Sequence, residues 1–326
     1  MRPLVAGTAL VLAAAAWSPA VAAPADDPLV QARRAARDHS FTGQVEVVWR
    51  DAGREHKATV DVRSANGSLV VSGTKTVMDT GDRARFVRRR EGGWELLWSA
   101  SSPSAAAPSP STKYRTAETG TTAVADRAAR VLEVREGAML RQRLALDMQT
   151  NLVLRREHLA TDGRVERVVT FTSLKIPDQP PVPAPPSSSE DHAGRAISAV
   201  SAPFSAPPVL REGYRRVGLY EDGGVVQALY NDGLYDLSVF EQRGRLNRGD
   251  VPASGRRLKL GDRRAWGYTW PGGHMLLWHA EGTVYAMVSD APMEHLIAAA
   301  DSLPTAGLSL SLGDRLRRIC RSLVRL

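Results

Sequence analysis

The feature that most constrains this fold is a long run of short segments in which apolar and polar residues alternate. Such alternation is typical of strands with one buried face, and turn-forming pairs such as Asn66-Gly67, Gly92-Gly93 and Asp162-Gly163 separate the segments at hairpin spacing. The segments therefore predict a large antiparallel sheet, which curls because so many strands twist in succession. The predicted strands are 44–49, 57–62, 69–72, 83–87, 94–98, 129–134, 140–147, 152–158 and 165–172.

A single helix precedes these strands. Asp26, Asp27 and Pro28 provide the acids and the proline that are typical of a helix start, and the helix is predicted to run to about Asp38. Its apolar residues are mostly small, so it is expected to lie flat on the sheet. They are Leu29, Val30, Ala32, Ala35 and Ala36. The first domain is therefore predicted to be α+β, a curled antiparallel half-barrel with a helix packed on it.

A second, smaller α+β domain is predicted after a proline-rich stretch. Asn231-Asp232-Gly233 supplies residues that tolerate a positive φ, so this tripeptide predicts a tight turn before the strand 234–242. Ser289-Asp290 is expected to cap a helix from Ala291 to about Leu303, which Pro304 ends. The pattern predicts an antiparallel sheet packed on one helix. Its strands are expected at 214–220, 225–230, 234–242, 257–260, 264–270, 274–279 and 283–288.

The N-terminal residues predict export. A basic start, an apolar run from Leu4 to Trp17 and the small-x-small site Ala20-Val21-Ala22 are typical of a secretory signal peptide, 1–22. The protein is thus expected to be periplasmic or extracytoplasmic, and either soluble or peripherally associated with a membrane. Composition divides the remainder into four parts: a half-barrel domain, 23–176, a Pro/Ser-rich linker, 177–208, a second domain, 209–304, and a basic tail, 305–326. The half-barrel domain contains a Ser/Ala/Pro insertion at 99–111.

The basic composition does not predict nucleic-acid binding. The formal net charge is +8, but the arginines are scattered through strands and turns, and no helix-turn-helix or comparable module is readable. The tail Leu312–Leu326 differs, because leucines at helical spacing alternate there with arginines. Such a helix suits an anionic membrane surface, a groove on a partner, or a place on its own domain.

Catalytic and metal-binding patterns are missing from the sequence, which shows no nucleophile elbow, no zinc-protease motif and no phosphate-binding loop. His274 and His279 are five residues apart in a predicted strand, so they face opposite sides and cannot share a metal. The one cysteine, Cys320, provides neither an intramolecular disulfide nor a cysteine-based zinc site. We therefore expect a binding protein without enzymatic activity, cofactor or metal.

One face of the first sheet is expected to be unusually apolar. Its large residues could line a cavity for an acyl chain or another apolar ligand, and they could equally form an ordinary core beneath the helix. Periodicity does not separate these two interpretations. The residues are Trp49, Phe86, Trp94, Leu96, Trp98, Leu144 and Phe171, with Met148 and Leu152 beside them.

Several motifs resemble those of the MucB/RseB family, the sigma-E factor regulatory proteins. The sequence Phe41-Thr42-Gly43-Gln44-Val45 is similar to the entry into that family's first strand. Tyr230-Asn231-Asp232-Gly233-Leu234, followed by Ser238-Val239-Phe240-Glu241, resembles its hallmark strand. Met287-Val288-Ser289-Asp290-Ala291-Pro292 resembles its final passage from strand to helix.

This resemblance implies a fold and a function. Members pair a half-barrel similar to the lipoprotein carriers LolA and LolB with a smaller domain that helps to hold an anti-sigma factor. The resemblance thus implies a negative regulator in the envelope stress response. Such a regulator binds the exported domain of the anti-sigma factor and protects that domain from proteolysis. It releases the domain when a lipid or other apolar ligand binds. The residues that we expect to face the partner are Arg215, Arg216, Tyr235, Leu237, Val239 and Phe240, although such residues could equally belong to the core. The alternative is a lipid or lipoprotein carrier, which uses the same half-barrel but delivers its cargo to a membrane.

Overall fold

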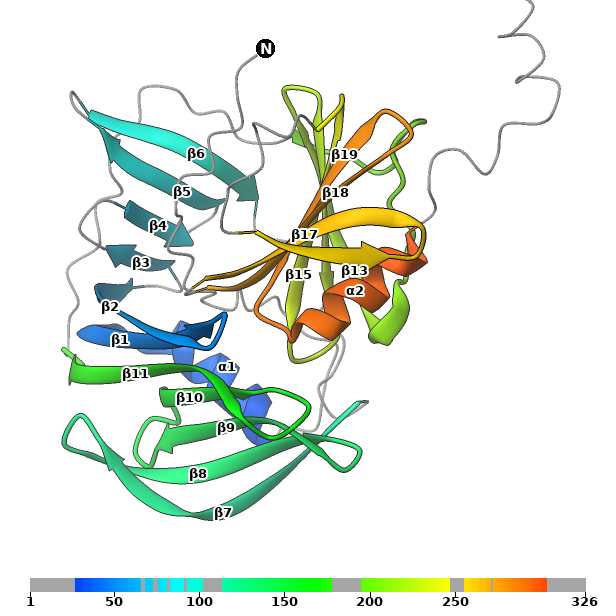
Figure 1. The fold of residues 1–326 in the computed structure, drawn as a ribbon. Coiled ribbons are helices and arrows are strands. Elements are labelled where there is room, and N and C mark those ends of the chain that lie inside the picture. Colours follow the sequence, from blue (N-terminus) through cyan, green and yellow to red (C-terminus); the bar gives the residue numbers. More distant parts are fainter. Residues whose placement is uncertain are drawn as a thin grey trace, which may run out of the picture.

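The computed structural model describes residues 27–65, 68–72, 76–80, 83–90, 93–101, 113–177, 195–246, 255–270 and 272–303, and between residues 65 and 101 it describes the backbone. The predicted signal peptide, most of the 99–111 insertion and the basic tail lie outside these residues. Within them the chain forms two antiparallel sheets and two α-helices (Figure 1), which confirms the predicted α+β class.

The first sheet has eleven strands in the described part of the chain, in the order β6-β5-β4-β3-β2-β1-β11-β10-β9-β8-β7. Neighbours in the chain pair as hairpins, and antiparallel pairing of β1 with β11 joins the two halves of the sheet. The strands are β1 (Phe41–Asp51), β2 (Arg54–Ala65), β3 (Ser68–Ser72), β4 (Thr76–Thr80), β5 (Arg83–Arg90), β6 (Gly93–Ser101), β7 (Tyr114–Val124), β8 (Arg127–Glu136), β9 (Met139–Asp147), β10 (Val153–Leu159) and β11 (Val165–Lys175).

Two of these strands, β4 and β7, were not predicted. β4 has five residues, too few for a clear alternation of apolar and polar side chains. β7 is an edge strand whose residues from Ala117 to Ala123 are exposed on both faces, so no buried face imposes a pattern on its sequence.

Helix α1 (Pro28–Asp38) packs on this sheet as expected (Figure 1). The Asp27 carboxylate accepts a hydrogen bond from the Leu29 backbone N–H at 2.9 Å, and Pro28 occupies the first turn, where no N–H partner is needed. Ala35 shares a buried apolar cluster with Val45 and Val47 of β1. The small side chains of the helix thus allow it to lie close against the strands.

The second sheet has eight strands within the described residues, in the order β12-β13-β14-β15-β19-β18-β17-β16. It begins inside the stretch that composition assigns to the linker, because residues 195–196 already pair with β13. The strands are β12 (Arg195–Ala196), β13 (Arg215–Asp222), β14 (Val225–Asn231), β15 (Asp236–Arg243), β16 (Arg256–Leu260), β17 (Arg263–Trp270), β18 (Gly273–Ala280) and β19 (Thr283–Ser289). A short 3-10 turn, η2 (Arg211–Gly213), and helix α2 (Met293–Ser302) pack on it.

The start of α2 corrects one prediction. The helix begins at Met293 and not at Ala291, and its N-cap is Pro292, which makes no side-chain capping bond. The Ser289 hydroxyl instead accepts a hydrogen bond from the Ala291 N–H at 3.0 Å and donates one to the Asp236 carbonyl at 2.6 Å. Ser289 therefore holds the chain between β19 and α2 against β15 and does not cap the helix.

The two sheets share one apolar core. Leu29 of α1 and Leu144 of β9 belong to the same buried cluster as Tyr235, beside β15, and Leu296 of α2. A second cluster, beneath α1, belongs to the first sheet alone. Because apolar burial is the main source of stability, the second sheet is part of the same folded body as the half-barrel. No helix in the described part of the chain is both long enough and apolar enough to span a membrane.

Glu241 on β15 makes the stability of this core depend on pH. Its side chain is 1% exposed, one carboxylate oxygen accepts a hydrogen bond from the Ser205 N–H at 2.9 Å, and the other has no partner among the described residues. Burial raises its pKa from the ordinary 4.5 to about 7, and the bond from Ser205 only partly offsets this. Because the folded state holds the proton more tightly than the unfolded state, this contribution to stability is complete below pH 4.5 and is lost as the pH rises through about 7.

We expect Glu241→Gln to remove this pH dependence, because the amide keeps the shape without an ionisable proton. At pH values above the folded pKa the variant should gain up to roughly 3 kcal/mol in the free energy of unfolding relative to the parent protein. Urea unfolding measured across the pH range checks this, with Glu221→Gln on partly exposed β13 as the matched control. Equal slopes of stability against pH in the parent protein and the Glu241 variant would contradict the assignment.

Candidate functional site

The two sheets meet at a junction that contains many charged side chains. It joins β7, β8, β9, β10, β11 and α1 of the first sheet to the turn between β14 and β15, η2 and α2 of the second. We call this region the junction and describe its two polar networks in turn.

The turn 231–235 is built by its own side chains. The Asn231 side-chain oxygen accepts from the Gly233 N–H at 2.6 Å, and Asp232 Oδ1 accepts from the N–H groups of Leu234 and Tyr235 at 3.0 and 2.8 Å. Gly233 has a φ of 100°, which a residue with a Cβ rarely adopts. The predicted tight turn is therefore present, and it leaves Asp232 Oδ2 available to the other sheet.

The first network is centred on Asp232. Its side chain has no exposed surface. Oδ2 accepts a hydrogen bond from the Tyr114 hydroxyl and forms an ion pair with Lys113 Nζ at 3.1 Å, and both partners lie at the start of β7. Burial and the neighbouring carboxylate raise the pKa of Tyr114 far above its ordinary value, so the phenol keeps its proton. Lys113 also contacts Glu136 Oε1 at 3.0 Å and the Glu212 carbonyl at 2.7 Å. One ammonium therefore links β8 to two segments of the second sheet.

Glu136 and Arg141 extend this network to α2. Arg141, with 4% of its side chain exposed, places Nε 2.8 Å from Glu136 Oε2 and Nη1 3.1 Å from Glu294 Oε1. Burial by itself would raise the pKa of Glu136, but His295, Lys113 and Arg141 together hold it well below the usual range. Glu136 is thus an anion that two cations and a buried histidine stabilise.

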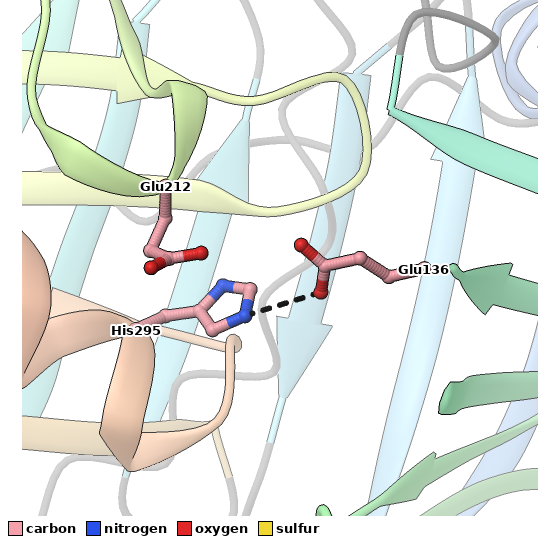
Figure 2. Close-up of side chains that lie close together, drawn as sticks. All are labelled: Glu136, Glu212 and His295. Atoms are coloured by element: carbon pink, nitrogen blue, oxygen red, sulfur yellow. Dashed lines mark ion pairs between the residues drawn. The ribbon is translucent and has the colours of Figure 1, made fainter. Parts of the chain in front are cut away.

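Three side chains of this network have the composition of a metal site. Ligand atoms of Glu136, Glu212 and His295 lie within 4.8 Å of one another, and Figure 2 shows the His295 ring directed at Glu136 with the Glu212 carboxylate beside it. Lys113 Nζ, however, already lies 3.0 Å from Glu136 and 3.8 Å from the Glu212 carboxylate. A divalent cation would have to displace this ammonium, so we interpret the cluster as part of the ion-pair network.

The second network joins β10, β11 and α1 to the turn between β14 and β15, to β18 and to the segment before α2. Arg33 of α1 donates a hydrogen bond to the Gly233 carbonyl. Arg156 Nη1 lies 3.8 Å from Asp290 Oδ2, and Arg167 donates to the Asp290 carbonyl at 3.3 Å. Glu166 and His274 form a further pair across the sheets at 3.7 Å. The charges of the junction are therefore paired mainly between the sheets, as expected for two surfaces that pack against each other.

The residues predicted to line an apolar cavity are divided between the two apolar clusters where their side chains are described. Leu144 is 2% exposed in the shared core, Phe171 packs edge-on against Phe41 at 5.8 Å, and half-buried Trp49 stacks on His56 at 5.3 Å. For Phe86, Trp94, Leu96 and Trp98 only the backbone positions on β5 and β6 are described, where Phe86 pairs with Trp98. The structure thus brings Leu144 to the junction and leaves Trp49 and Phe171 on the central strands.

The predicted partner-facing residues divide between core and surface. Tyr235, Leu237 and Val239 are at most 1% exposed inside the shared core and offer no surface to a partner in this conformation. Arg215 is exposed, whereas Arg216 is half-buried and donates to the Ala206 carbonyl. Phe240 is half-buried on β15. Of this set, the arginines and Phe240 have surface through which a partner can be contacted.

Sequence reasoning identified the Asn-Asp-Gly turn but missed the residues that meet it. Lys113 and Tyr114 lie at the start of an edge strand that has no periodicity, and Arg141 is a charged residue in a predicted strand. The one available signal was the charge at positions 133–143, where a strand with one buried face would be expected to carry apolar residues. That signal does not indicate which distant residue completes each pair.

We expect Asp232→Asn to loosen the junction. The amide oxygen can still accept the two turn hydrogen bonds, but Lys113 loses its fully buried counter-ion, so the free energy of unfolding should fall by about 2–4 kcal/mol. Urea unfolding measures the loss, with Asp301→Asn at the exposed end of α2 as the control, whose pair with Arg263 should contribute under about 1 kcal/mol. Similar losses in the two variants would contradict a special role for Asp232.

Comparison with known proteins gives the family of the first domain. A family model described as the MucB/RseB N-terminal domain matches residues 73–192. No curated protein sequence matches the chain. Among solved structures, the chain is similar to the MucA/MucB complex of Pseudomonas aeruginosa, with 20% identity over 87% of this chain and 99% of that chain and a TM-score of 0.48.

Two further structures extend the comparison. MucB in complex with MucA(peri) has 19% identity over 87% of this chain and 99% of that chain, with a TM-score of 0.47. A LolA superfamily protein from Nitrosomonas europaea has 13% identity over 49% of this chain and 96% of that chain, with a TM-score of 0.24. The family model is the match that carries weight, and it confirms the resemblance read from the sequence motifs: residues 73–192 match the MucB/RseB N-terminal domain.

Proposed function

We propose that this protein is an exported negative regulator of an extracytoplasmic, sigma-E-type sigma factor. It binds the exported domain of a membrane-spanning anti-sigma factor and protects that domain from proteolysis. The observation that carries the proposal is a MucB/RseB N-terminal domain that shares one core and a charged junction with a second sheet. The protein acts outside the cytoplasmic membrane, where its predicted signal peptide directs it.

The chemistry of the junction favours binding over catalysis. Its carboxylates and cations contact one another, as in the Lys113–Asp232 and Arg141–Glu136 pairs. Catalysis needs a nucleophile or base poised beside space for a substrate, whereas these groups occupy each other's hydrogen-bonding positions. The MucB/RseB family is likewise one of regulatory binding proteins. We therefore assign the protein no enzymatic activity.

The shared core provides a route by which an apolar ligand could release the partner. Leu144 is predicted to line the ligand cavity, yet its side chain is buried in a cluster that also contains residues of the second sheet and of α1. A lipid chain that takes this surface must displace one of them, so ligand binding and the closed junction compete. A ligand that binds the open form better lowers the population of the closed form and the affinity for any partner that needs it.

The alternative is a lipid or lipoprotein carrier. The apolar residues predicted on the half-barrel favour it, because a carrier needs a cavity for an acyl chain. A carrier has no need for a second sheet joined to the half-barrel by buried ion pairs, and a regulator that must hold a partner and respond to a ligand does. The junction therefore favours the regulator.

We expect residues 23–326 to bind the exported domain of the organism's own anti-sigma factor with micromolar affinity or tighter, and a membrane lipid extract to weaken that binding. Titration calorimetry with and without the extract measures both effects. Arg215→Glu should weaken binding about tenfold by reversing the charge at the proposed contact, while Arg264→Glu, at an exposed position of β17, should leave it unchanged.

No binding, together with lipid that stays with the protein through purification, would reject the regulator for the tested partner and favour the carrier. Equal effects of the two arginine variants would reject the location of the contact but leave the function standing. A protease digestion of the anti-sigma domain, monitored by gel electrophoresis, distinguishes binding of this domain from its protection against proteolysis.

A further inference from the structure

The hairpin formed by β16 and β17 carries unpaired positive charge. Residues 255–270 contain five arginines and lysines against one carboxylate, Asp262. One of these cations, Arg263, is half-buried and lies 3.7 Å from Asp301 of α2. The other four are exposed, and their side chains have no hydrogen-bond or ion-pair partner in the part of the chain that the structure describes. They are Arg256, Arg257, Lys259 and Arg264.

Three of these cations share one face of the hairpin. Lys259 lies directly opposite Arg264 in the strand register, and Arg257 is two residues from Lys259 on the same side. Like charges in such cross-strand positions repel each other and destabilise a hairpin. On the first sheet, by contrast, Arg143 is paired across strands with Glu157 at 2.8 Å. An anionic partner would remove the repulsion that the β16–β17 hairpin leaves uncompensated.

The basic tail starts beside this hairpin. Helix α2 ends at Ser302, and Asp301 in its last turn contacts Arg263 next to the turn between β16 and β17 (Figure 1). A Cβ added to Gly261 in that turn would lie 3.9 Å from Asp301 Oδ1. At roughly 3.3 Å per residue, residues 304–311 span at most about 26 Å. The predicted tail helix Leu312–Leu326 is therefore within reach of the hairpin surface.

The tail has the same charge as the hairpin, so neither can neutralise the other. Residues 305–326 contain five arginines and one carboxylate, a surplus of +4 that equals the surplus of residues 255–270. The two surpluses together equal the formal net charge of the whole chain, +8, so the remaining residues are balanced. The net positive charge of the protein is thus concentrated around the end of α2, and its repulsion opposes docking of the tail on the hairpin.

We propose that the β16–β17 hairpin and the basic tail together form a surface that binds an anionic phospholipid membrane. The apolar residues of the tail recur at helical spacing, so they can enter the membrane interface while the arginines contact lipid phosphates. Each hairpin cation near the membrane adds about fivefold to the affinity. An acidic protein surface would satisfy the cations alone, whereas a membrane satisfies the cations and the apolar stripe together.

This membrane contact goes beyond the proposed function and does not depend on it. If the protein does regulate a membrane-spanning anti-sigma factor, the contact keeps it beside its partner. The hairpin lies outside the residues proposed to contact that partner, among which Arg215 is on β13. Membrane binding and partner binding can therefore be measured and lost separately.

The test is sedimentation of residues 23–326 with vesicles that contain about 30% phosphatidylglycerol in phosphatidylcholine. We expect the protein to sediment with these vesicles and to bind pure phosphatidylcholine vesicles at least about tenfold more weakly, because neutral lipid offers the cations no net charge. Raising the salt to about 0.5 M should weaken the binding to anionic vesicles by a similar factor, because salt screens exposed charges.

Paired substitutions locate the surface. Lys259→Gln combined with Arg264→Gln should weaken binding to anionic vesicles about 25-fold, because two of the facing cations are lost. Arg63→Gln combined with Arg115→Gln removes the same charge from exposed positions of β2 and β7 on the first sheet. This control should change vesicle binding by less than about twofold, because these charges are screened from the membrane.

Leu316→Ser combined with Leu323→Ser tests the apolar stripe and should weaken vesicle binding by about tenfold or more. Calorimetric titration of the anti-sigma domain should be unaffected by the hairpin variant. Equal binding to neutral and anionic vesicles, or equal losses in the hairpin variant and its control, would overturn the proposal. A hairpin variant that loses the anti-sigma domain but keeps the vesicles would also overturn it, and would assign this surface to an acidic protein.

Discussion

The arrangement of the two sheets depends on one buried carboxylate. Asp232 forms its own turn through Oδ1, and in the described part of the chain its buried Oδ2 is paired with Lys113 and Tyr114 of the first sheet. Left unpaired in an apolar site, this charge would cost several kcal/mol. The turn between β14 and β15 can therefore keep this conformation without water around the carboxylate only while β7 packs against it and supplies its partners. The fold of one domain thus completes the electrostatics of the other.

Sequence periodicity predicted strands that have one buried face, such as β19, where buried and partly exposed residues alternate. It failed at β7, which has no buried face. The assignment of Tyr235, Leu237 and Val239 to a partner came from family resemblance, although their own period of two indicates a buried face. The polar network could not be predicted, because Lys113 and Asp232 are 119 residues apart and only the tertiary fold makes them neighbours.

Buried charges at this junction provide specificity more than stability. An ion pair that leaves water loses most of its attraction to desolvation, so an apolar junction of the same size would hold the sheets at least as firmly. The charges instead select one alignment of the two sheets. Lys113 must meet Asp232 and Arg141 must meet Glu294 for both sets to be satisfied, and a slipped arrangement leaves several charges unpaired. Such a surface closes in one way or opens, which is the behaviour that a two-state regulator requires.

The apolar part of the junction sets how strong a ligand must be to open it. Moving such an equilibrium from 1:99 to 99:1 requires a differential affinity of about 5.5 kcal/mol. At about 0.8 kcal/mol for each buried methylene, roughly seven methylenes of an acyl chain would suffice. Leu144 and Leu29 are buried in the shared core of the closed form, so an acyl chain must displace part of that core to contact them. A short polar ligand cannot supply this energy through apolar burial, and for this reason an acyl chain is the ligand class that the proposed release requires.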